Sequence, residues 1–384
     1  MKVLFIAGWY PDEKNVVEGV FVQEHARAAA LFNEIAVIHG RESKTQKESY
    51  RFSEQKENGF PVIRFTYRRH FFQRSSSFYV RGILIAFEKL KERGFIPQVV
   101  HANVFHTARA ATIIKKTYGI PFVLTEHKSR FLFPSFLKGR LKRVRWIPEA
   151  TMIMPVSQTL LEGMKSHGIR GSFSVVPNTI DTDIFYPPIN KKCDKNLKKM
   201  LAVARITPVK GIGDLLQALK ELKKKRDDFS LDIIGAGKAK RNYEKMVDKS
   251  GLSQNVRFLG VKNKKEVASL MRQSDFFVLP TFHRETFCCV FAEAMACGLP
   301  IIGTTAWAVP EFFGNPEFGI LVPPGDITRL VRAIEHMLDN CQEYDSAKIA
   351  EYSRERFSYN AIGKKFSEIY QKEFVPSPQK KGLF

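Results

Sequence analysis

The sequence contains little cysteine and no long hydrophobic run. Only five of its 384 residues are cysteines, at positions 193, 288, 289, 297 and 341. Because this number is odd and the adjacent Cys288 and Cys289 cannot readily form a relaxed disulfide, the simplest interpretation is a protein of the reducing cytoplasm. No run approaches the roughly 20 apolar residues that span a bilayer. The apolar residues 1–7 are not followed by a cleavage site, and we interpret them as a strand.

The sequence also lacks motifs of common metal and nucleotide sites. Cys288, Cys289 and Cys297 have neither a second CxxC pair nor a nearby HxxxH, which argues against zinc. The absence of GxxxxGKS/T argues against a P-loop enzyme. Acidic residues are scarce, with 39 Asp and Glu against 61 Lys and Arg. The resulting net charge of +22 predicts an anionic partner, which could be nucleic acid, a phosphate-bearing substrate or an acidic membrane.

Strand-like and helix-like segments alternate in two series. The first series begins with a strand at 3–7 and a helix at 19–32 and ends with a strand at 173–177. The second begins with a strand at 200–204 and ends with two helices after a strand at 320–322. This βαβ alternation predicts parallel sheets with helices on both faces.

The length and the break in the alternation predict two domains. A chain of 384 residues is too long for one ordinary core. We expect an α/β protein with two Rossmann-like, doubly wound domains that face each other across a cleft holding the active site. The expected divisions are a first domain at 1–185, a linker at 186–198, a second domain at 199–355, and, at 356–384, a helix that returns toward the first domain, followed by a tail.

Two carboxylates, Glu285 and Glu293, stand eight residues apart around an apolar run. The run has the spacing of a helix with one buried face, for which Thr286 is the expected N-cap and Gly298 the expected end. A strand-like run at 275–280 precedes it, so we expect Glu285 at the strand exit and Glu293 about two turns inside the helix. Ligands of open α/β sheets bind at such exits. The alternative is a loop carboxylate and a solvated helix carboxylate.

Basic residues and glycines follow two other strands of the second half. Arg205 leaves the strand at 200–204 and Lys210 precedes a helix, an arrangement that suits a diphosphate. Two solvated bases in a loop are the alternative. Gly235 and Gly237 would allow the backbone to approach a nucleotide closely, although the third glycine of a dinucleotide fingerprint is absent.

These motifs, in this order, resemble those of the retaining glycosyltransferases of family 4. The resemblance covers nearly the full chain, and its motifs are Trp9-Tyr-Pro11, Glu18-Gly19, Val99-Val-His-Ala102, Thr125-Glu-His127, Pro155-Val-Ser157, Pro177-Asn-Thr-Ile-Asp181, Arg205 with Lys210, Glu285 with Glu293-Ala-Met-Ala-Cys-Gly-Leu-Pro300, and Gly319-Ile-Leu-Val-Pro-Pro-Gly-Asp326. The family has the GT-B fold. Its members transfer a sugar from a nucleotide diphosphate to an acceptor hydroxyl with retained anomeric configuration.

The resemblance implies that the domain at 1–185 binds the acceptor and the domain at 199–355 binds the nucleotide sugar, and it implies a role for each matched residue. Arg205 and Lys210 would neutralise the leaving diphosphate, Glu293 would accept from the ribose hydroxyls, and Glu285 would lie against the donor sugar. His127 would hydrogen-bond that sugar. The remaining donor-binding positions implied are Gly19, Gly235, Gly237, Thr286, Phe287 and Cys288. We expect a UDP-sugar or GDP-sugar as donor, no cofactor or metal, and a proton transfer from the acceptor to the leaving phosphate on one face of the sugar.

The chain departs from the family pattern near these residues. The family usually has glycines where Thr286 and Cys288 stand, and a glycine pair where Trp307 and Ala308 stand. We expect this bulkier loop to narrow donor choice or to shift the phosphate backbone. Asp181-Thr-Asp183 is similar to the metal-binding DxD of another glycosyltransferase class, but we interpret it as a turn.

A basic and aromatic segment at 128–146 predicts attachment to an anionic membrane. Its apolar spacing fits one helical face, as in an interfacial helix, and the alternative is a solvated helix whose apolar face packs in the core. The expected membrane or acceptor patch comprises Arg68, Arg69, Arg74, Lys138, Arg140, Lys142, Arg143 and Arg145. We therefore expect a cytoplasmic enzyme, peripheral on the inner face of the cell membrane, with a glycan or lipid-linked acceptor used in surface polysaccharide assembly.

A different class of function remains open from the sequence. The net charge, together with the interleaved bases and aromatics at 64–74, would also suit a basic nucleic-acid-binding or membrane-binding protein without catalysis. No known nucleic-acid-binding module is present, and the donor motifs would go unexplained. We expect no nucleic-acid partner, and binding of a nucleotide diphosphate against an oligonucleotide would separate the two hypotheses.

Overall fold

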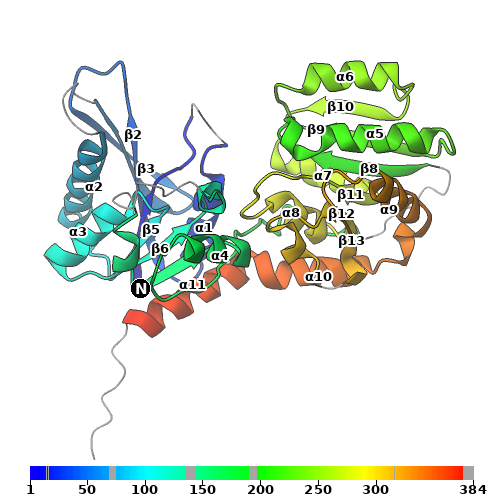
Figure 1. The fold of residues 1–384 in the computed structure, drawn as a ribbon. Coiled ribbons are helices and arrows are strands. Elements are labelled where there is room, and N and C mark those ends of the chain that lie inside the picture. The colour runs from blue at the N-terminus through cyan, green and yellow to red at the C-terminus, as the bar shows by residue number, and fades with distance from the viewer. Residues whose placement is uncertain are drawn as a thin grey trace, which may run out of the picture. The chain divides into compact units, whose positions relative to one another are not determined.

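The computed structural model describes residues 1–13, 15, 17–68, 75–134, 144–189, 197–314 and 316–374. The chain divides into two compact units (Figure 1). Unit 1 comprises Met1–Thr179 and Tyr359–Phe384, and unit 2 comprises Ile180–Ser358. The first crossing thus falls at 179/180, six residues before the expected boundary at 185, and the return falls at 358/359. Part of the expected linker, residues 190–196, lies outside the described residues.

Unit 1 is built on a seven-stranded sheet in the order β3-β4-β2-β1-β5-β6-β7. The strands are β1 (Lys2–Ala7), β2 (Glu34–Glu42), β3 (Tyr50–Glu57), β4 (Phe60–Tyr67), β5 (Val99–Asn103), β6 (Phe122–Glu126) and β7 (Met152–Pro155), and the helices are α1 (Val20–Ala30), α2 (Ser75–Glu92), α3 (Ala108–Tyr118), α4 (Gln158–Ser166) and α11 (Tyr359–Phe374). Every residue of β5 and β6 is buried, which explains why the sequences of these strands do not alternate between apolar and polar residues. From β1 the chain first adds β2 on one side and later β5 on the other, so the strand order reverses between β1 and β5.

The last helix, α11, completes the core of unit 1. Its side chains Ile362, Phe366 and Tyr370 pack in one buried cluster with residues of β1 such as Val3 and Phe5. The Tyr370 hydroxyl also lies 2.6 Å from Nδ1 of His101 on β5. Helix α11, the last of the described elements, therefore stabilises the domain that the first residues of the chain begin.

One strand of unit 1 was not expected from the sequence. Strand β3 pairs with β4 in antiparallel register, with Glu57 opposite Phe60, so the prediction of purely parallel pairing is wrong here. The two residues of the turn, Asn58 and Gly59, both have positive φ, at 49° and 89°. An Asn-Gly pair is the strongest short-range signal for a two-residue hairpin, but β3 is an exposed edge strand of mainly polar residues and lacks an apolar pattern.

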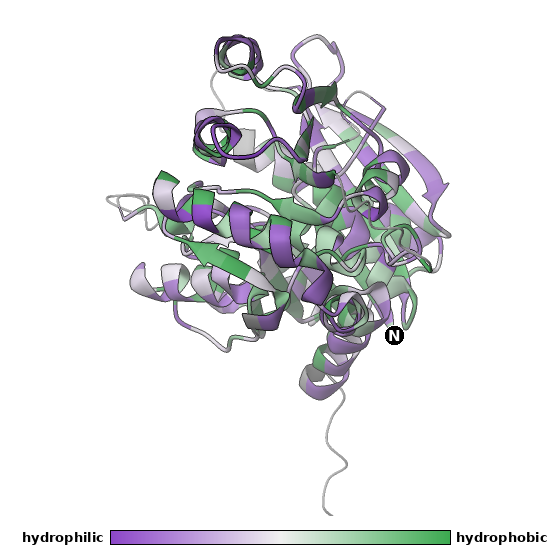
Figure 2. Ribbon diagram, turned by 90° about the vertical axis from the view of Figure 1, so that its right-hand side faces the viewer, coloured by the Kyte–Doolittle hydropathy of each residue, from purple (hydrophilic) through white to green (hydrophobic). Residues whose placement is uncertain are grey.

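Unit 2 is built on a six-stranded parallel sheet in the order β10-β9-β8-β11-β12-β13. The strands are β8 (Lys198–Val203), β9 (Phe229–Ile234), β10 (Val256–Gly260), β11 (Phe276–Val278), β12 (Ile301–Thr304) and β13 (Gly319–Val322), and the helices are α5 (Ile212–Lys223), α6 (Lys240–Lys249), α7 (Lys264–Gln273), α8 (Cys289–Ala296), α9 (Ile327–Asn340) and α10 (Ser346–Phe357). The strand order reverses between β8 and β11. Within the units the strands are mostly hydrophobic, whereas the helices carry alternating hydrophobic and hydrophilic stripes (Figure 2).

Two smaller expectations need correction. The segment at 173–177 forms only a single bridge, between Phe173 and Ile153 of β7, because Pro155 has no N–H to continue the ladder, although the Val176 N–H still donates to the Pro155 carbonyl at 3.0 Å. Three helices follow β13 instead of two, since α9, α10 and α11 are separate. Asp345 caps the first turn of α10 through its side chain, which marks the additional boundary.

Candidate active site

The loops that leave β8 and β11 are joined where the strand order of unit 2 reverses. Gly211 ends the first loop with φ 73°, and a Cβ there would lie 2.0 Å from the carbonyl oxygen of Pro280. Phe282 donates its backbone N–H to the carbonyl of Val209 at 3.1 Å, and the Thr281 hydroxyl lies 3.3 Å from the same oxygen. The close contact requires glycine at 211, and it brings the side chains of both loops together.

Lys210 and Glu285 form an ion pair at this junction. The Lys210 ammonium donates to Oε1 of Glu285, and the Thr281 hydroxyl lies 3.3 Å from that oxygen. The side chains are only 14% and 11% exposed, so water screens the pair weakly. The structure thus brings together two residues that are 75 positions apart in the sequence, as the sequence interpretation of both as strand-exit residues requires.

The charge state of Lys210 follows from its surroundings. Burial alone would lower the pKa of its ammonium, but Cys288 once its thiol ionises at high pH, the Glu285 carboxylate and the hydrogen bond between Lys210 and Glu285 outweigh burial, so the pKa is raised. Burial raises the pKa of the Cys288 thiol well above its ordinary value. Lys210 is therefore a cation and Cys288 an uncharged thiol at neutral pH. Arg205, on the same loop, is exposed.

Helix α8 begins later than the sequence predicts. Its N-cap is Cys288 and not Thr286, and Glu293 is the fifth residue of the helix and not two turns inside it. The backbone is held as a loop because the Glu285 carbonyl accepts from the N–H of Ala308 at 3.4 Å. The ring of Phe287 packs against Phe312 and Phe357. Gly298, with φ 75°, ends the helix as expected.

The other predicted donor-binding residues of unit 2 have structural surroundings of their own. The Phe287 side chain is half-buried and packs against the core of unit 2. Added Cβ atoms at Gly235 and Gly237 would lie 1.9 and 2.1 Å from the carbonyl oxygens of Ala204 and Ile206. The close approach that these two glycines permit in the structure is thus to the loop that carries Arg205.

His127 and Gly19 lie in unit 1. His127 follows β6 and is buried beside the rings of Phe21 and His25, with centroid distances of 4.5 and 5.4 Å. Burial is the main reason that its pKa is well below the ordinary value, so the imidazole is neutral. Gly19 caps α1 with φ 75°, and a Cβ there would lie 2.4 Å from the backbone of Trp9. Glycine is required at this position by the fold itself.

Most of the expected membrane patch lies outside the described residues, namely Arg69, Arg74, Lys138, Arg140, Lys142 and Arg143. Arg68 and Arg145 are described and exposed. Phe131, Leu132 and Val144 from the same segment are buried, so these apolar side chains pack in the core as the alternative interpretation held. No helix of the described residues is both long and apolar enough to span a membrane.

Asp181 and Asp183 form a turn. The N–H of Asp183 donates to a carboxylate oxygen of Asp181 at 3.2 Å, and Asp181 is buried. Across the described ranges, no cluster of three or more His, Cys, Asp or Glu side chains has an arrangement that could hold a metal ion. The local hydrogen bond is that of an Asx turn.

Sequence reasoning gave Trp307 no structural role. Its φ of 53° is in the left-handed region, which favours glycine, and its exposed ring lies 5.0 Å from the guanidinium of Arg284. Ala308 is hydrogen-bonded to Glu285, so the side chains of Trp307 and Arg284 lie beside the Lys210–Glu285 ion pair. The available sequence signal for this conformation was the bulky Trp307, which stands where the resembling family usually has glycine.

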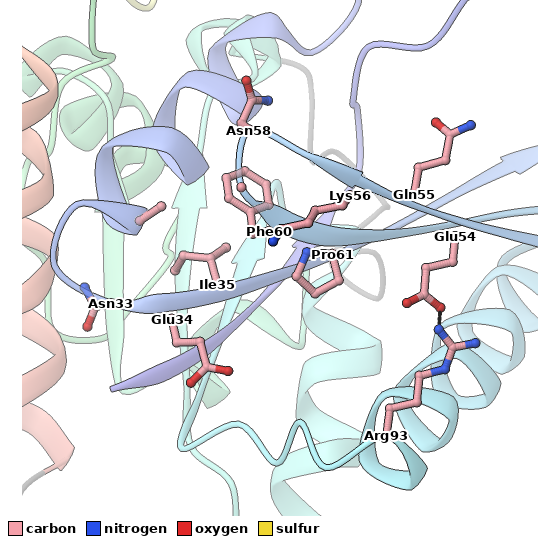
Figure 3. Close-up of a pocket in the computed structure, with 12 residues that line it drawn as sticks. Asn33, Glu34, Ile35, Glu54, Gln55, Lys56, Asn58, Phe60, Pro61 and Arg93 are labelled. Atoms are coloured by element: carbon pink, nitrogen blue, oxygen red, sulfur yellow. Dashed lines mark ion pairs between the residues drawn. The ribbon is translucent and has the colours of Figure 1, made fainter.

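A large cavity in unit 1 lies away from the carboxyl ends of the strands. It has a volume of about 930 Å³ and is lined by the start of β2 and the β3–β4 turn, including Glu34, Lys56 and Asn58 (Figure 3). Glu54 and Arg93 form an ion pair on its wall. Since ligands of doubly wound sheets bind at the opposite strand ends, we do not assign this cavity to the active site.

Two family models together match most of the chain. The model described as Glycosyltransferase Family 4 matches residues 19–184, and the model described as Glycosyl transferases group 1 matches residues 188–361. The chain is a family 4 glycosyltransferase. The sequence-based predictions of this family and of an enzyme are confirmed.

Relatives and solved structures agree with this assignment. A GDP-mannose-dependent monoacylated alpha-(1-6)-phosphatidylinositol monomannoside mannosyltransferase of Corynebacterium glutamicum is 25% identical over 72% of this chain and 74% of its own length. The sucrose-phosphate synthase of Thermosynechococcus elongatus is 19% identical, with a TM-score of 0.74, over 98% of this chain and 100% of its own. Anabaena HepE, solved with UDP, is 18% identical with the same TM-score, over 97% and 100%. The GT-B fold of this glycosyltransferase is therefore confirmed.

Proposed function

We propose that this glycosyltransferase moves a hexose-type sugar from a nucleotide diphosphate to an acceptor hydroxyl and retains the anomeric configuration. The observation that carries the proposal is the Lys210–Glu285 ion pair at the point where the strand order of unit 2 reverses. Its nearly buried ammonium, with the exposed Arg205 on the same loop, is a cationic group suited to a diphosphate.

The two cations act on the leaving group. Negative charge builds on the leaving phosphate as the bond between the anomeric carbon and the phosphate oxygen breaks, and a charge-assisted hydrogen bond contributes roughly 1.5–3 kcal/mol there. Glu285 holds the Lys210 ammonium in place, so the cation does not have to reorganise during the reaction. Glu293 accepts from the ribose hydroxyls, and the backbone N–H groups of residues 286–288 face the phosphates.

Retention follows from a transfer on one face of the sugar. The acceptor oxygen forms its bond to the anomeric carbon on the side from which the diphosphate leaves, and the acceptor proton passes to a phosphate oxygen. Glu285 does not serve as a covalent nucleophile in this scheme, because its carboxylate is engaged by Lys210 and faces Thr281. His127, a neutral imidazole, hydrogen-bonds the donor sugar.

The donor and acceptor classes are inferred from relatives. The name of the Corynebacterium relative specifies GDP-mannose and a phosphatidylinositol mannoside, whereas HepE was solved with UDP. We infer a GDP-sugar or UDP-sugar donor and a lipid-linked or surface-polysaccharide precursor as acceptor. The enzyme would work in the cytoplasm, peripheral on the inner face of the membrane.

A panel of nucleotide sugars tests the reaction. We expect one UDP-sugar or GDP-sugar to be hydrolysed slowly and to raise the melting temperature, since a ligand at 100 times its Kd stabilises by about 2.7 kcal/mol. Proton NMR of the transfer product reports the anomeric configuration. A product of inverted configuration would refute retention, and a panel with neither hydrolysis nor stabilisation would refute nucleotide-sugar dependence.

Co-sedimentation with vesicles tests the membrane location. We expect binding to vesicles that contain acidic phosphatidylglycerol, lost steeply as salt rises, because each base near an anionic bilayer contributes about 1 kcal/mol. The triple change Lys142→Glu, Arg143→Glu and Arg145→Glu should release the protein. Changing the exposed Lys220, Lys224 and Lys225 of unit 2 to glutamate controls for total charge. No binding at low salt would indicate an acceptor that is free in solution.

A further inference from the structure

The ring of His127 packs against one turn of helix α1. Phe21 and His25 are four residues apart, so their side chains lie on the same face of this helix. Their ring centroids lie 4.5 and 5.4 Å from that of His127. Both histidines are buried, with 0% of His25 and 7% of His127 exposed. The orientation of the His127 ring therefore depends on these two side chains of α1.

The main chain at His127 is fixed by the carboxylate of Glu126. Oε1 of Glu126 accepts from the N–H groups of His127 and Lys128 at 2.9 and 2.8 Å, and Oε2 accepts from the N–H of Phe105 at 2.8 Å. Glu126 is fully buried, so water does not compete for these hydrogen bonds. With the main chain fixed in this way, the direction of the His127 side chain remains to be set by its neighbours.

His25 is itself held in one orientation. Its Nε2 lies 3.0 Å from the carbonyl oxygen of Pro177. Because a carbonyl only accepts, Nε2 carries the hydrogen and donates it, and Nδ1 of the neutral ring is an acceptor. The His25 ring also lies edge-to-face against Phe366 of α11, with the ring centroids 5.0 Å apart. The neighbour of His127 is thus fixed from two sides.

The hydrogen bond to Pro177 does not by itself require a ring at position 25. Burial lowers the pKa of His25 to about 4, so the imidazole is neutral near pH 7. Its Nδ1 is buried and has no hydrogen-bond partner within the part of the chain that the structure describes. An unmet acceptor destabilises the folded state, whereas a glutamine side chain could donate to Pro177 without an imidazole. The ring of His25 therefore requires a further explanation.

We propose that His25 is a positioning residue for the transfer reaction, and that its ring holds the imidazole of His127 in the orientation in which that imidazole meets the donor sugar. The proposal rests on the proposed function, in which His127 hydrogen-bonds the sugar. His25 does not touch the substrate and acts through His127. Its flat ring limits the rotation of the neighbouring imidazole, so the hydrogen bond to the sugar forms without loss of side-chain freedom.

Two substitutions separate the ring of His25 from its hydrogen bond. His25→Gln keeps an N–H donor for the Pro177 carbonyl and removes the ring, whereas His25→Phe keeps a ring and removes the donor. We expect His25→Gln to lower kcat/KM for nucleotide-sugar hydrolysis at least tenfold, because a small misplacement of a substrate-positioning group has such an effect. His25→Phe should keep kcat/KM within about threefold of the wild type. Its Tm should be the lower of the two, since a buried carbonyl loses its donor.

Calorimetric binding of the donor and of its parts gives a readout that a purely structural role would not change. The full-length protein is titrated with UDP-glucose, UDP-galactose, UDP-N-acetylglucosamine and GDP-mannose, and with UDP and GDP. For the nucleotide sugar that binds most tightly, we expect His25→Gln to weaken binding at least fivefold. Binding of the corresponding nucleoside diphosphate should change less than twofold, because His127 meets only the sugar.

A double variant tests whether His25 acts through His127. His127→Ala should lower kcat/KM at least as much as His25→Gln does. Adding His25→Gln to His127→Ala should cause less than a twofold further loss, as expected of two residues that act as one unit. Tyr370→Phe, which removes the hydroxyl that lies 2.6 Å from His101 in the same core, is the matched control. It should lower Tm and leave kcat/KM unchanged.

The outcomes separate the positioning role from the proposed function. Turnover that follows Tm across the two His25 variants, equal weakening of nucleotide sugar and diphosphate, or a full further loss in the double variant would show that His25 only belongs to the core. Wild-type kinetics of His127→Ala would also overturn the positioning role, while the transferase function would stand. If the wild type neither binds nor hydrolyses any of the nucleotide sugars, the proposed function itself fails, and the positioning role fails with it.

Discussion

The Lys210–Glu285 pair provides a test that separates structural from catalytic roles. Lys210→Met leaves the Glu285 carboxylate 11% exposed and without its cation. Removing one partner of a buried pair costs about 3–5 kcal/mol, and because Thr281 still faces the carboxylate we expect about 3 kcal/mol. Glu285→Gln leaves the buried ammonium and should cost a similar amount. The double variant removes both charges, and we expect it to recover most of the lost stability.

Turnover should respond differently from stability. If Lys210 stabilises the leaving diphosphate, the double variant remains at least tenfold slower than the wild type, because a lost transition-state contact of about 1.4 kcal/mol has that effect. Urea unfolding followed by circular dichroism measures stability, and nucleotide-sugar hydrolysis measures turnover. The exposed pair Lys240–Glu244 on α6 is the matched control, for which both quantities should change little. Recovery of turnover together with stability in the double variant would show that the pair is purely structural.

Three further predictions concern the metal, the donor loop and the last helix. Activity should survive EDTA, and a loss that Mn²⁺ or Mg²⁺ restores would contradict this. Trp307→Gly should change stability by less than about 1 kcal/mol, since relief of the positive φ offsets the lost stacking on Arg284, and it should broaden donor choice. Unchanged rate ratios across nucleotide sugars would show that Trp307 does not select the donor. Tyr370→Ala should destabilise unit 1 by about 4 kcal/mol because the ring is fully buried, whereas Tyr370→Phe loses only the contact with His101, worth about 1–2 kcal/mol. Similar melting temperatures for the two variants would argue against that packing role.

The parallel strands of the core can be predicted from the sequence, because strands that are buried on both faces consist mainly of apolar residues. Strand β1 from Val3 onward and strand β11 are continuous apolar runs, and charged residues follow β8 and β11 where a ligand would lie. Strand β3 leaves no such trace, because its exposed edge position favours polar residues. Its only signal is the Asn58-Gly59 turn.

The late start of α8 could not be predicted from the periodicity of its apolar residues. The apolar spacing of residues 287–295 is that of a helix, yet Phe287 fills a gap between Phe312 and Phe357, which come from elements far along the chain. A tertiary contact thus decides the helix boundary. The same holds for the pairing of Lys210 with Glu285, which depends on strand order rather than on either local motif.

The net charge of the whole chain predicts the partner of a given site less well than the side chains at that site do. The value of +22 is a sum over the whole chain, whereas charges in water act over about 8–10 Å at moderate salt. In unit 2 the local charge agrees with the sum, since Lys210 and Arg205 belong to one loop and suit a diphosphate. Around Asp232 the chain also carries a basic partner, since Arg257 pairs with that carboxylate and the two charges cancel locally. Elsewhere in unit 1 the exposed Arg68 and Arg145 do agree in sign with the sum, so a test of anion binding has to name the local side chains and cannot rest on the total.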